Sequence, residues 1–225
     1  MPRNSKKPTV LSLFSGAGGL DIGLETAGFD TRLCVEIDPV ARETLKRNRP
    51  TWRQADPGDI HQQTPESLMA AAGLRPQELD LLAGGPPCQP FSKSGYWARG
   101  DAKRLNDPRA ATLDAYLRIV GGTLPRVVLL ENVRGLTYSG KDEGLHLLVR
   151  GFCEINRNHG TDYALTVCHL NAAHYGVPQF RERVFVVADR AGRTFCLPDA
   201  THGETTSSAA AKSPISATIN PFTRA

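Results

Sequence analysis

The sequence predicts an α/β protein, with a Rossmann-like, mostly parallel sheet and helices on both faces. Short apolar runs alternate with segments in which apolar residues recur at helical spacing, and two such segments open with Asp-Pro. Asp-Pro is typical of a helix start, because the carboxylate caps free N–H groups and proline already has a helical φ. Repeated strand, helix and strand segments build parallel sheets.

The first half of the chain alternates strands and helices. Gly28 ends the first helix, because glycine readily adopts the left-handed conformation that follows a helix. Asp38 and Pro39 begin the second helix. We expect strands at residues 10–14, 33–36, 52–55 and 79–83, and helices at residues 20–27 and 39–47.

The second half ends differently. Asp107-Pro108 begins a helix with Leu113, Leu117 and Val120 on one face, and a later helix has its buried stripe at Leu145, Leu148, Val149, Phe152 and Ile155. Strands are expected at residues 126–131, 163–167 and 184–188. The last two have no helix signal between them, so they should form an antiparallel pair. Residues 201–225 show little apolar periodicity.

Composition limits the class of protein. The formal charge of +4 and pI of about 8.9 permit nucleic-acid binding without requiring it. No apolar run is long enough to span a membrane, and residues 1–10 lack the apolar core of a signal peptide, so we expect a cytoplasmic protein. The five cysteines are odd in number and form no Cys-x-x-Cys pair, so neither disulfides nor a metal site is expected.

Candidate functional side chains directly follow the predicted strands, and open α/β sheets bind ligands beyond the carboxyl ends of their strands. A glycine-rich turn, Phe14 to Gly19, offers N–H groups at a helix N-terminus, although a tight turn explains it equally well. Glu36 follows the second strand, where an acid holds ribose hydroxyls or simply favours the next helix. Asp59 follows the third and can accept a hydrogen bond from an adenine amino group.

Cys88 lies in Gly-Gly-Pro-Pro-Cys-Gln-Pro-Phe-Ser, directly after an apolar strand. Pro87 restricts the backbone before the cysteine, so the loop presents the thiol in a defined direction, as for a nucleophile. The alternative is a turn with a half-buried cysteine.

Glu131 ends the apolar run Val127 to Leu130, and burial there would raise its pKa, which suits a proton donor. The alternative is a structural acid paired with Arg181 or Arg183. These two arginines alternate, which places both on one face of an extended segment. A surface ion-pair ladder is the other reading.

Taken together, these motifs resemble those of the DNA cytosine-5 methyltransferases. The resemblance covers residues 9 to 200 in the family's order: Phe14-Ser-Gly-Ala-Gly-Gly, Glu36, Gly58-Asp-Ile, Pro86-Pro-Cys-Gln-Pro-Phe-Ser, Glu131-Asn-Val and Gln179-Phe-Arg-Glu-Arg. It implies an S-adenosylmethionine-dependent methyltransferase fold that transfers a methyl group to cytosine C5 in DNA.

The resemblance also implies residue roles. Cys88 is the nucleophile that attacks cytosine C6, Glu131 engages N3, and Arg183 holds O2 with support from Arg181. S-adenosylmethionine is expected to contact Phe14, Gly16, Ala17, Gly18, Gly19, Glu36, Ile37, Asp59, Ile60 and Pro87. The partner is duplex DNA with a flipped cytosine, over which residues 92–106 would close. The expected setting is a bacterial restriction-modification system, with the protein on the nucleoid when bound to DNA.

The resemblance stops before the family's target-recognition region and last two motifs. We expect a flexible tail at residues 1–8, a catalytic cofactor-binding domain at 9–198, and the start of a truncated recognition region or a linker at 199–225. The chain is then half of a split enzyme, a truncated product or a fragment. The first favours a second polypeptide and predicts poor solubility without it.

Other functions fit part of the pattern. A dinucleotide-dependent oxidoreductase would use the glycine turn and Glu36, but it would not need Cys88, Glu131 and the paired arginines. A transfer-RNA cytosine-5 methyltransferase shares much of the motif set. An inactive nucleic-acid-binding remnant would retain these residues after a recent truncation.

Overall fold

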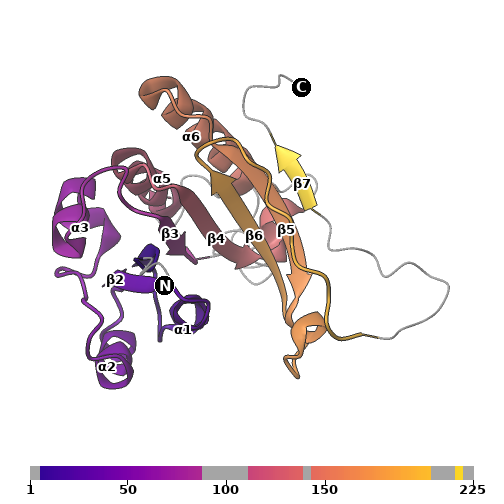
Figure 1. The fold of residues 1–225 in the computed structure, drawn as a ribbon, viewed down its shortest axis with the longest axis horizontal. Helices are drawn as coiled ribbons and strands as arrows, with labels where there is room; N and C mark the ends of the chain where they lie inside the picture. The colour runs from indigo at the N-terminus through magenta and orange to yellow at the C-terminus, as the bar shows by residue number, and fades with distance from the viewer. Residues whose placement is uncertain (1–5, 88–110, 139–142, 204–215, 220–225) are drawn as a thin grey trace, which may run out of the picture. The chain divides into compact units, whose positions relative to one another are not determined.

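The computed structural model describes residues 6–87, 111–138, 143–203 and 216–219 (Figure 1). The chain forms two compact units. The first comprises Met1–Pro86 and Asp114–Val128, and the second comprises Pro87–Leu113 and Leu129–Ala225. Within the described ranges, no helix has both the length and the apolar character needed to cross a membrane.

The first unit is built on parallel strands. β1 pairs in parallel with β2 on one side and with β3 on the other, so Leu11 lies opposite both Leu33 and Leu82. Backbone bonds from Arg126 and Val127 to residues 79 and 80 continue this ladder beyond β3. The elements are β1 (Thr9–Leu13), α1 (Gly19–Thr26), β2 (Asp30–Val35), α2 (Pro39–Asn48), η1 (Ile60–Gln62), α3 (Pro65–Ala72), β3 (Leu81–Gly84) and α5 (Ala111–Thr123), whose first three residues fall in the second unit.

Local chemistry explains the helix ends. The Asp38 carboxylate accepts from the N–H groups of Val40 and Ala41, and Pro39 occupies the first turn of α2, as the sequence predicts. Gly28 has φ +94°, a conformation that side chains disfavour, and the chain turns there from α1 into β2. The expected helix face of α5 is confirmed by the burial of Leu113, Leu117 and Val120.

Two expectations for this unit need correction. Residues 52–55 form an isolated bridge between Cys34 and Gln54, with no strand. The ladder stops there because Pro57 has no N–H to donate. Helix α3 was not predicted from the sequence, although Thr64 and Ser67 form a capping box and Pro65 occupies its first turn.

The second unit carries the antiparallel strands. β5 and β6 pair from Ala164 opposite Asp189 to Asn171 opposite Glu182, which confirms the expected antiparallel pair (Figure 1). The strand order is β4-β6-β5-β7. The elements are β4 (Val127–Val133), which begins in the first unit, η3 (Arg134–Thr137), α6 (Glu143–His159), β5 (Ala164–Asn171), η4 (Ala172–Tyr175), β6 (Glu182–Asp189) and β7 (Ser216–Ile219).

Two further differences concern this unit. β4 runs on to Val133, so Glu131 lies inside the strand and not at its end. β7 pairs antiparallel with β5, within a stretch where the sequence shows no strand pattern. The predicted fold class, a mostly parallel α/β sheet with antiparallel strands toward its C-terminal end, is confirmed.

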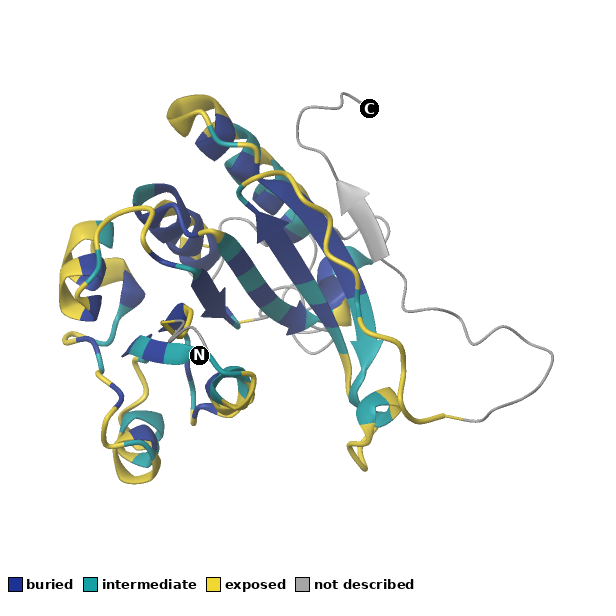
Figure 2. Cartoon of the chain, viewed as in Figure 1, coloured by how far each residue is buried: buried dark blue, intermediate teal, exposed yellow. Residues whose placement is uncertain are grey.

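Buried strand interiors and one face of α6 form the core of the second unit (Figure 2). Phe152 from α6 meets Tyr163 edge to face, with ring centroids 5.4 Å apart. Burying an aromatic or aliphatic side chain of this size contributes about 1.5–3 kcal/mol. Asn156 secures the turn into β5, because its amide accepts from Tyr163 N and donates to Tyr163 O.

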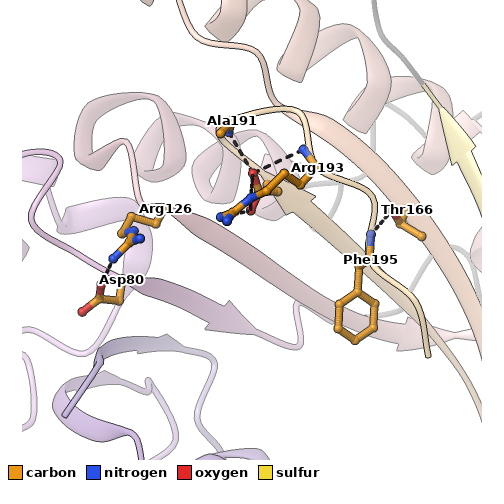
Figure 3. A network of polar contacts seen from close by, with 7 residues as sticks. Asp80, Arg126, Thr166, Ala191, Arg193 and Phe195 are labelled. Atoms are coloured by element: carbon orange, nitrogen blue, oxygen red, sulfur yellow. Dashed lines mark hydrogen bonds and ion pairs between the residues drawn. The ribbon is translucent and has the colours of Figure 1, made fainter. Parts of the chain in front are cut away.

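Polar clasps close strand ends in each unit (Figure 3). After β6, the Asp189 carboxylate accepts from Arg193 Nη2 at 2.7 Å and from Ala191 N at 2.9 Å. In the first unit, Asp80 accepts from Thr9 N at 2.9 Å and from Arg126 Nη1 at 3.2 Å. Asp80 thus ties together the segments that enter β1, β3 and β4.

Candidate cofactor and catalytic sites

The glycine turn after β1 adopts conformations that favour glycine. Gly16 and Gly18 have φ of +54° and +88°, and Gly18 is the N-cap of α1. A Cβ added at Gly18 would lie 2.9 Å from Leu45 Cδ2, so a side chain there would displace α2. Phe14 also has a positive φ of 56°. The turn thus brings backbone N–H groups to the start of a helix.

Glu36 lies across this turn, as the sequence predicts. Its carboxylate accepts from Gly16 N at 2.7 Å and from Asp38 N at 2.8 Å. A carboxylate has about four acceptor positions, so ribose hydroxyls can bind beside these two N–H groups. The neighbouring Ile37 side chain is 64% exposed, which makes it available to a flat ring. Ala17 and Gly19 are exposed as well.

Asp59 is the N-cap of η1. It accepts from His61 N at 2.9 Å and from Gln62 Nε2 at 3.2 Å. The hydrogen bond from the His61 N–H, followed by smaller effects, lowers the pKa of Asp59, so the side chain is an ionised acceptor at neutral pH. Ile60 is buried, at 4% exposure.

Gly58 ties the Asp59 loop to the Glu36 loop. A Cβ added at Gly58 would lie 2.0 Å from the Glu36 carbonyl oxygen, which only glycine permits. The structure therefore brings together the glycine turn, Glu36 and the loop of Asp59, all within the first unit.

Asp21, which the sequence analysis did not single out, lies in α1 directly after this turn. Its side chain is fully buried, and neither carboxylate oxygen has a hydrogen-bond partner. Burial raises the pKa of Asp21. Burial and the nearby Asp21 also raise the pKa of the Cys34 thiol to about 12, which keeps it protonated and unreactive.

In the second unit, Glu131 and Arg183 form an ion pair. Arg183 Nε donates to Glu131 Oε1 at 2.7 Å, and the two side chains are 22% and 26% exposed. The partner that the sequence analysis gave as the structural alternative for Glu131 is thus present. A guanidinium can donate to the carbonyl oxygen of a pyrimidine, and a carboxyl group can donate to an acceptor ring nitrogen when it is protonated.

The remaining predicted catalytic residues and Pro87 are not members of this ion pair or lie outside the described ranges. Arg181 is exposed, and its backbone N–H donates to Asn171 Oδ1 at 3.1 Å. Pro87 is described and exposed, whereas Cys88 and residues 92–106 lie outside the described residues. Four other cysteines are described: Cys34 and Cys168 are buried, Cys153 is half-buried and Cys196 is exposed. Among the described residues, no three His, Cys, Asp or Glu side chains gather as metal ligands do.

The parallel sheet, the glycine turn, the acid after β2 and the acid of the Asp59 loop are features with which Rossmann-like proteins, S-adenosylmethionine-dependent methyltransferases among them, bind a nucleoside cofactor. The sequence profile described as C-5 cytosine-specific DNA methylase matches residues 8–220. The chain belongs to this family, whose members use S-adenosylmethionine as methyl donor.

Related proteins have type II methyltransferase names. M.AquIA of Picosynechococcus is 42% identical over 198 residues, which cover 86% of this chain and 77% of that protein. M.SacI of Streptomyces achromogenes is 40% identical, over 86% of this chain and 50% of that protein. The chain therefore spans about half the length of M.SacI.

Solved structures agree with the fold. A prophage-encoded DNA modification methyltransferase from E. coli superposes with a TM-score of 0.65 at 29% identity, over 82% of this chain and 47% of that one. The Dnmt2 methyltransferase of S. pombe gives a TM-score of 0.60 at 25% identity, over 84% of this chain and 52% of that one.

Proposed function

We propose that this chain is the catalytic region of a DNA cytosine-5 methyltransferase that acts on duplex DNA within a bacterial restriction-modification system. The Glu131–Arg183 ion pair, at 2.7 Å in a chain of this family, is the observation that carries the proposal. A dinucleotide-dependent oxidoreductase has no use for such a pair.

The reaction requires a nucleophile, because cytosine C5 attacks a methyl donor poorly. The Cys88 thiolate adds to C6 and forms a C–S bond, and the ring electrons move to C5. Glu131 engages N3 and Arg183 holds O2, so the charge that develops on the ring is neutralised as the thiolate adds. S-adenosylmethionine would supply an electrophilic methyl group, which C5 would accept as the bond from that methyl group to the donor sulfur breaks. A base then removes the C5 proton, the C6–S bond breaks, and Cys88 leaves as a thiolate.

The first unit holds the cofactor. Glu36 accepts from the ribose hydroxyls, Asp59 accepts from the adenine amino group, and the exposed Ile37 side chain lies against the adenine ring. The lowered pKa of Asp59 supports its acceptor role. The 2.7 Å bond from Gly16 N holds Glu36 over the turn that the cofactor approaches.

A second polypeptide carrying the target-recognition region and the final motifs completes the proposal. Relatives such as M.SacI are about twice as long as the part that this chain matches. Base-specific readout needs side chains that reach the DNA grooves, and the recognition region supplies them. The complex acts in the bacterial cytoplasm on nucleoid DNA, on a cytosine flipped out of the duplex.

Transfer of labelled methyl from S-adenosylmethionine tests the chemistry. Duplex DNA and transfer RNA are offered in parallel, with Cys88→Ala as background and Cys196→Ala as the matched control at an exposed thiol. We expect Cys88-dependent transfer to DNA when the second polypeptide is present. Preference for transfer RNA would overturn the substrate, and transfer by the chain alone would overturn the need for a partner.

The covalent step has a separate test. DNA carrying 5-fluorocytosine has no C5 proton to lose, so the Cys88 adduct should persist and shift the protein on a denaturing gel. The adduct is expected with Cys196→Ala and not with Cys88→Ala. An adduct that forms without Cys88 would contradict the assignment of the nucleophile.

A further inference from the structure

The segment from Ala55 to Gln63 carries Asp59 but has little regular structure of its own. Its only helical part among the described residues is η1, one turn of three residues. A loop with so few internal bonds needs outside contacts to hold a side chain at a fixed place. Two arginines from different helices supply those contacts.

Arg42, on α2, holds the beginning of the segment. Its Nη1 donates to the Ala55 carbonyl at 2.8 Å and to the Glu36 carbonyl at 3.1 Å. One guanidinium nitrogen therefore links the backbone beside the ribose acid to the backbone that leads to the adenine acid. The close approach of Gly58 to Glu36 O lies at the same place.

Arg118, on α5, holds the end of the segment. Its Nη2 donates to the Ile60 carbonyl at 3.0 Å, and its Nη1 donates to the Gln63 carbonyl at 2.8 Å. These carbonyls belong to the first residue of η1 and to the residue directly after it, and Asp59 immediately precedes the turn. A planar guanidinium can bond two acceptors at once in a fixed geometry, which a lysine ammonium on its flexible stem does not reproduce.

Gln63 reinforces the same end from within. It is buried, its Nε2 donates to the Pro57 carbonyl, and its Oε1 accepts from Ser67 Oγ at 2.9 Å. The segment is thus closed on itself by Gln63 and anchored to α2 and α5 by the two arginines.

We propose that Arg42 and Arg118 are positioning residues for the adenosine part of the cofactor. Neither contacts the cofactor, and each acts through backbone carbonyls. Arg118 fixes Asp59 against the adenine amino group, and Arg42 fixes the spacing between Asp59 and Glu36. This inference rests on the proposed cofactor roles of those two acids.

Calorimetric binding of two ligands tests the proposal: S-adenosylhomocysteine and its inosine analogue, which lacks the adenine amino group. Wild type should prefer the adenine ligand by about tenfold, the worth of one hydrogen bond to a charged acceptor. Arg118→Gln should bind the adenine ligand about tenfold more weakly, with the preference lost. Arg118→Lys should restore only part of it. Arg42→Gln should weaken both ligands, because it releases Glu36 as well.

The matched control is Arg53→Gln, since Arg53 Nη1 also donates to a helix carbonyl, that of Ala71, at 2.9 Å. The control should keep the wild-type preference. A parallel loss for both ligands in Arg118→Gln, or an unchanged preference, would overturn the proposal, because a merely structural residue cannot change a ratio between two ligands.

Hydrogen exchange in the ligand-free protein separates this inference from the proposed function. Arg118→Gln should speed exchange of the His61 amide, which donates to Asp59, and leave the amides of β2 unchanged. Unchanged exchange at His61 would overturn the proposal that Arg118 holds the Asp59 segment in place, even if the cofactor binds. Faster exchange in Arg118→Gln, together with no ligand binding by wild type, would support the anchoring of the segment by Arg118 and refute the proposed cofactor roles of Asp59 and Glu36.

Discussion

Asp21 places a carboxyl group in an environment that disfavours its charge. The side chain is fully buried and lacks a hydrogen-bond partner, and burial raises its pKa. The nearby Ser12 hydroxyl lowers the pKa in part, but it does not reach hydrogen-bonding geometry with Asp21. The folded state therefore binds the Asp21 proton more tightly than the unfolded state does.

Asp21→Asn should therefore stabilise the protein at neutral pH. An acid whose folded pKa is raised gives full stability below its unfolded pKa of 3.8, and stability falls as pH rises through the folded value. The asparagine variant lacks this loss, and we expect a gain of about 1 kcal/mol at pH 7 from removing the uncompensated group. Denaturant unfolding at a series of pH values from about pH 3, below the unfolded pKa, to about pH 7 measures the difference between the two proteins. Parallel curves for the two proteins would contradict the prediction.

Glu131→Gln should abolish most methyl transfer while leaving the fold intact. A glutamine keeps the side-chain shape but loses the carboxyl group that pairs with Arg183 at 2.7 Å and that donates a proton to cytosine N3 in the proposed reaction. The expected loss is about 10²–10⁴-fold in kcat, as for other acid–base groups. The partner-complemented enzyme is assayed by labelled methyl transfer.

A second glutamate in an ion pair, Glu182, provides the control for that experiment. Glu182 pairs with Arg134 at 2.6 Å, and both side chains are about half exposed. Glu182→Gln should change kcat by less than about twofold, because an exposed pair contributes little. Equal losses of kcat in the two variants would show that negative charge on β4 and β6 in general, and not Glu131 itself, supports methyl transfer.

At the scale of single residues, site positions could be predicted where both the residue type and its place relative to a strand indicate a function. Glu36 is found over the glycine turn, and Arg183 is found beside Glu131. Arg42 and Arg118 were not predicted, because an arginine that bonds backbone carbonyls leaves no pattern in the sequence. Asp21 escaped notice for a related reason: an acid in the first turn of α1 reads as an ordinary helix-dipole partner.

At the scale of elements, helices and strands were predicted where residues that mark their ends accompany a clear apolar pattern. Helix α2 was predicted because Asp38 and Pro39 mark its start. Helix α3 has comparable signals in Thr64 and Pro65, but its apolar stripe is short and its last turn is alanine-rich, so periodicity alone does not reveal it. The extension of β4 to Val133 depends on strand pairing, which local sequence does not encode.

The clasp after β6 should contribute stability that depends on pH. Burial alone would raise the pKa of Asp189, but hydrogen bonds from Arg193 and from the Ala191 and Arg193 N–H groups bring it below the ordinary value. A carboxyl group with a depressed folded pKa gives stability that is present above its unfolded pKa, 3.8, and lost as pH falls through the folded value.

Asp189→Asn should therefore destabilise the protein by about 1–2 kcal/mol at pH 7 and by progressively less below pH 4. Denaturant unfolding at a series of pH values measures the difference from wild type. Asp199→Asn, at an exposed aspartate further along the same segment, is the control and should be neutral. A loss that persists unchanged at pH 3 would point to packing and not to the charged clasp.

At the scale of the whole molecule, the order of motifs carried more information than any motif alone. The glycine turn and Glu36 follow the parallel strands β1 and β2, whose ends meet at one edge of the sheet, and the close approach of Gly58 to Glu36 brings the Asp59 loop to the same edge. The antiparallel pairing of β5 and β6 was predicted from the short connection between them. Strand β7 was not predicted, because its pairing with β5 joins residues far apart in sequence and no local pattern indicates it.

DNA binding by the chain alone is the last prediction and belongs to this scale. The formal charge is only +4, and the proposed function assigns base readout to a second polypeptide. The chain should then bind duplex DNA through phosphates, with an affinity that falls steeply with salt and differs by less than about threefold between sequences. Fluorescence anisotropy at several salt concentrations, with competitor duplexes of varied sequence, measures both. A preference of tenfold or more for one sequence would place recognition within this chain and remove the reason for a partner.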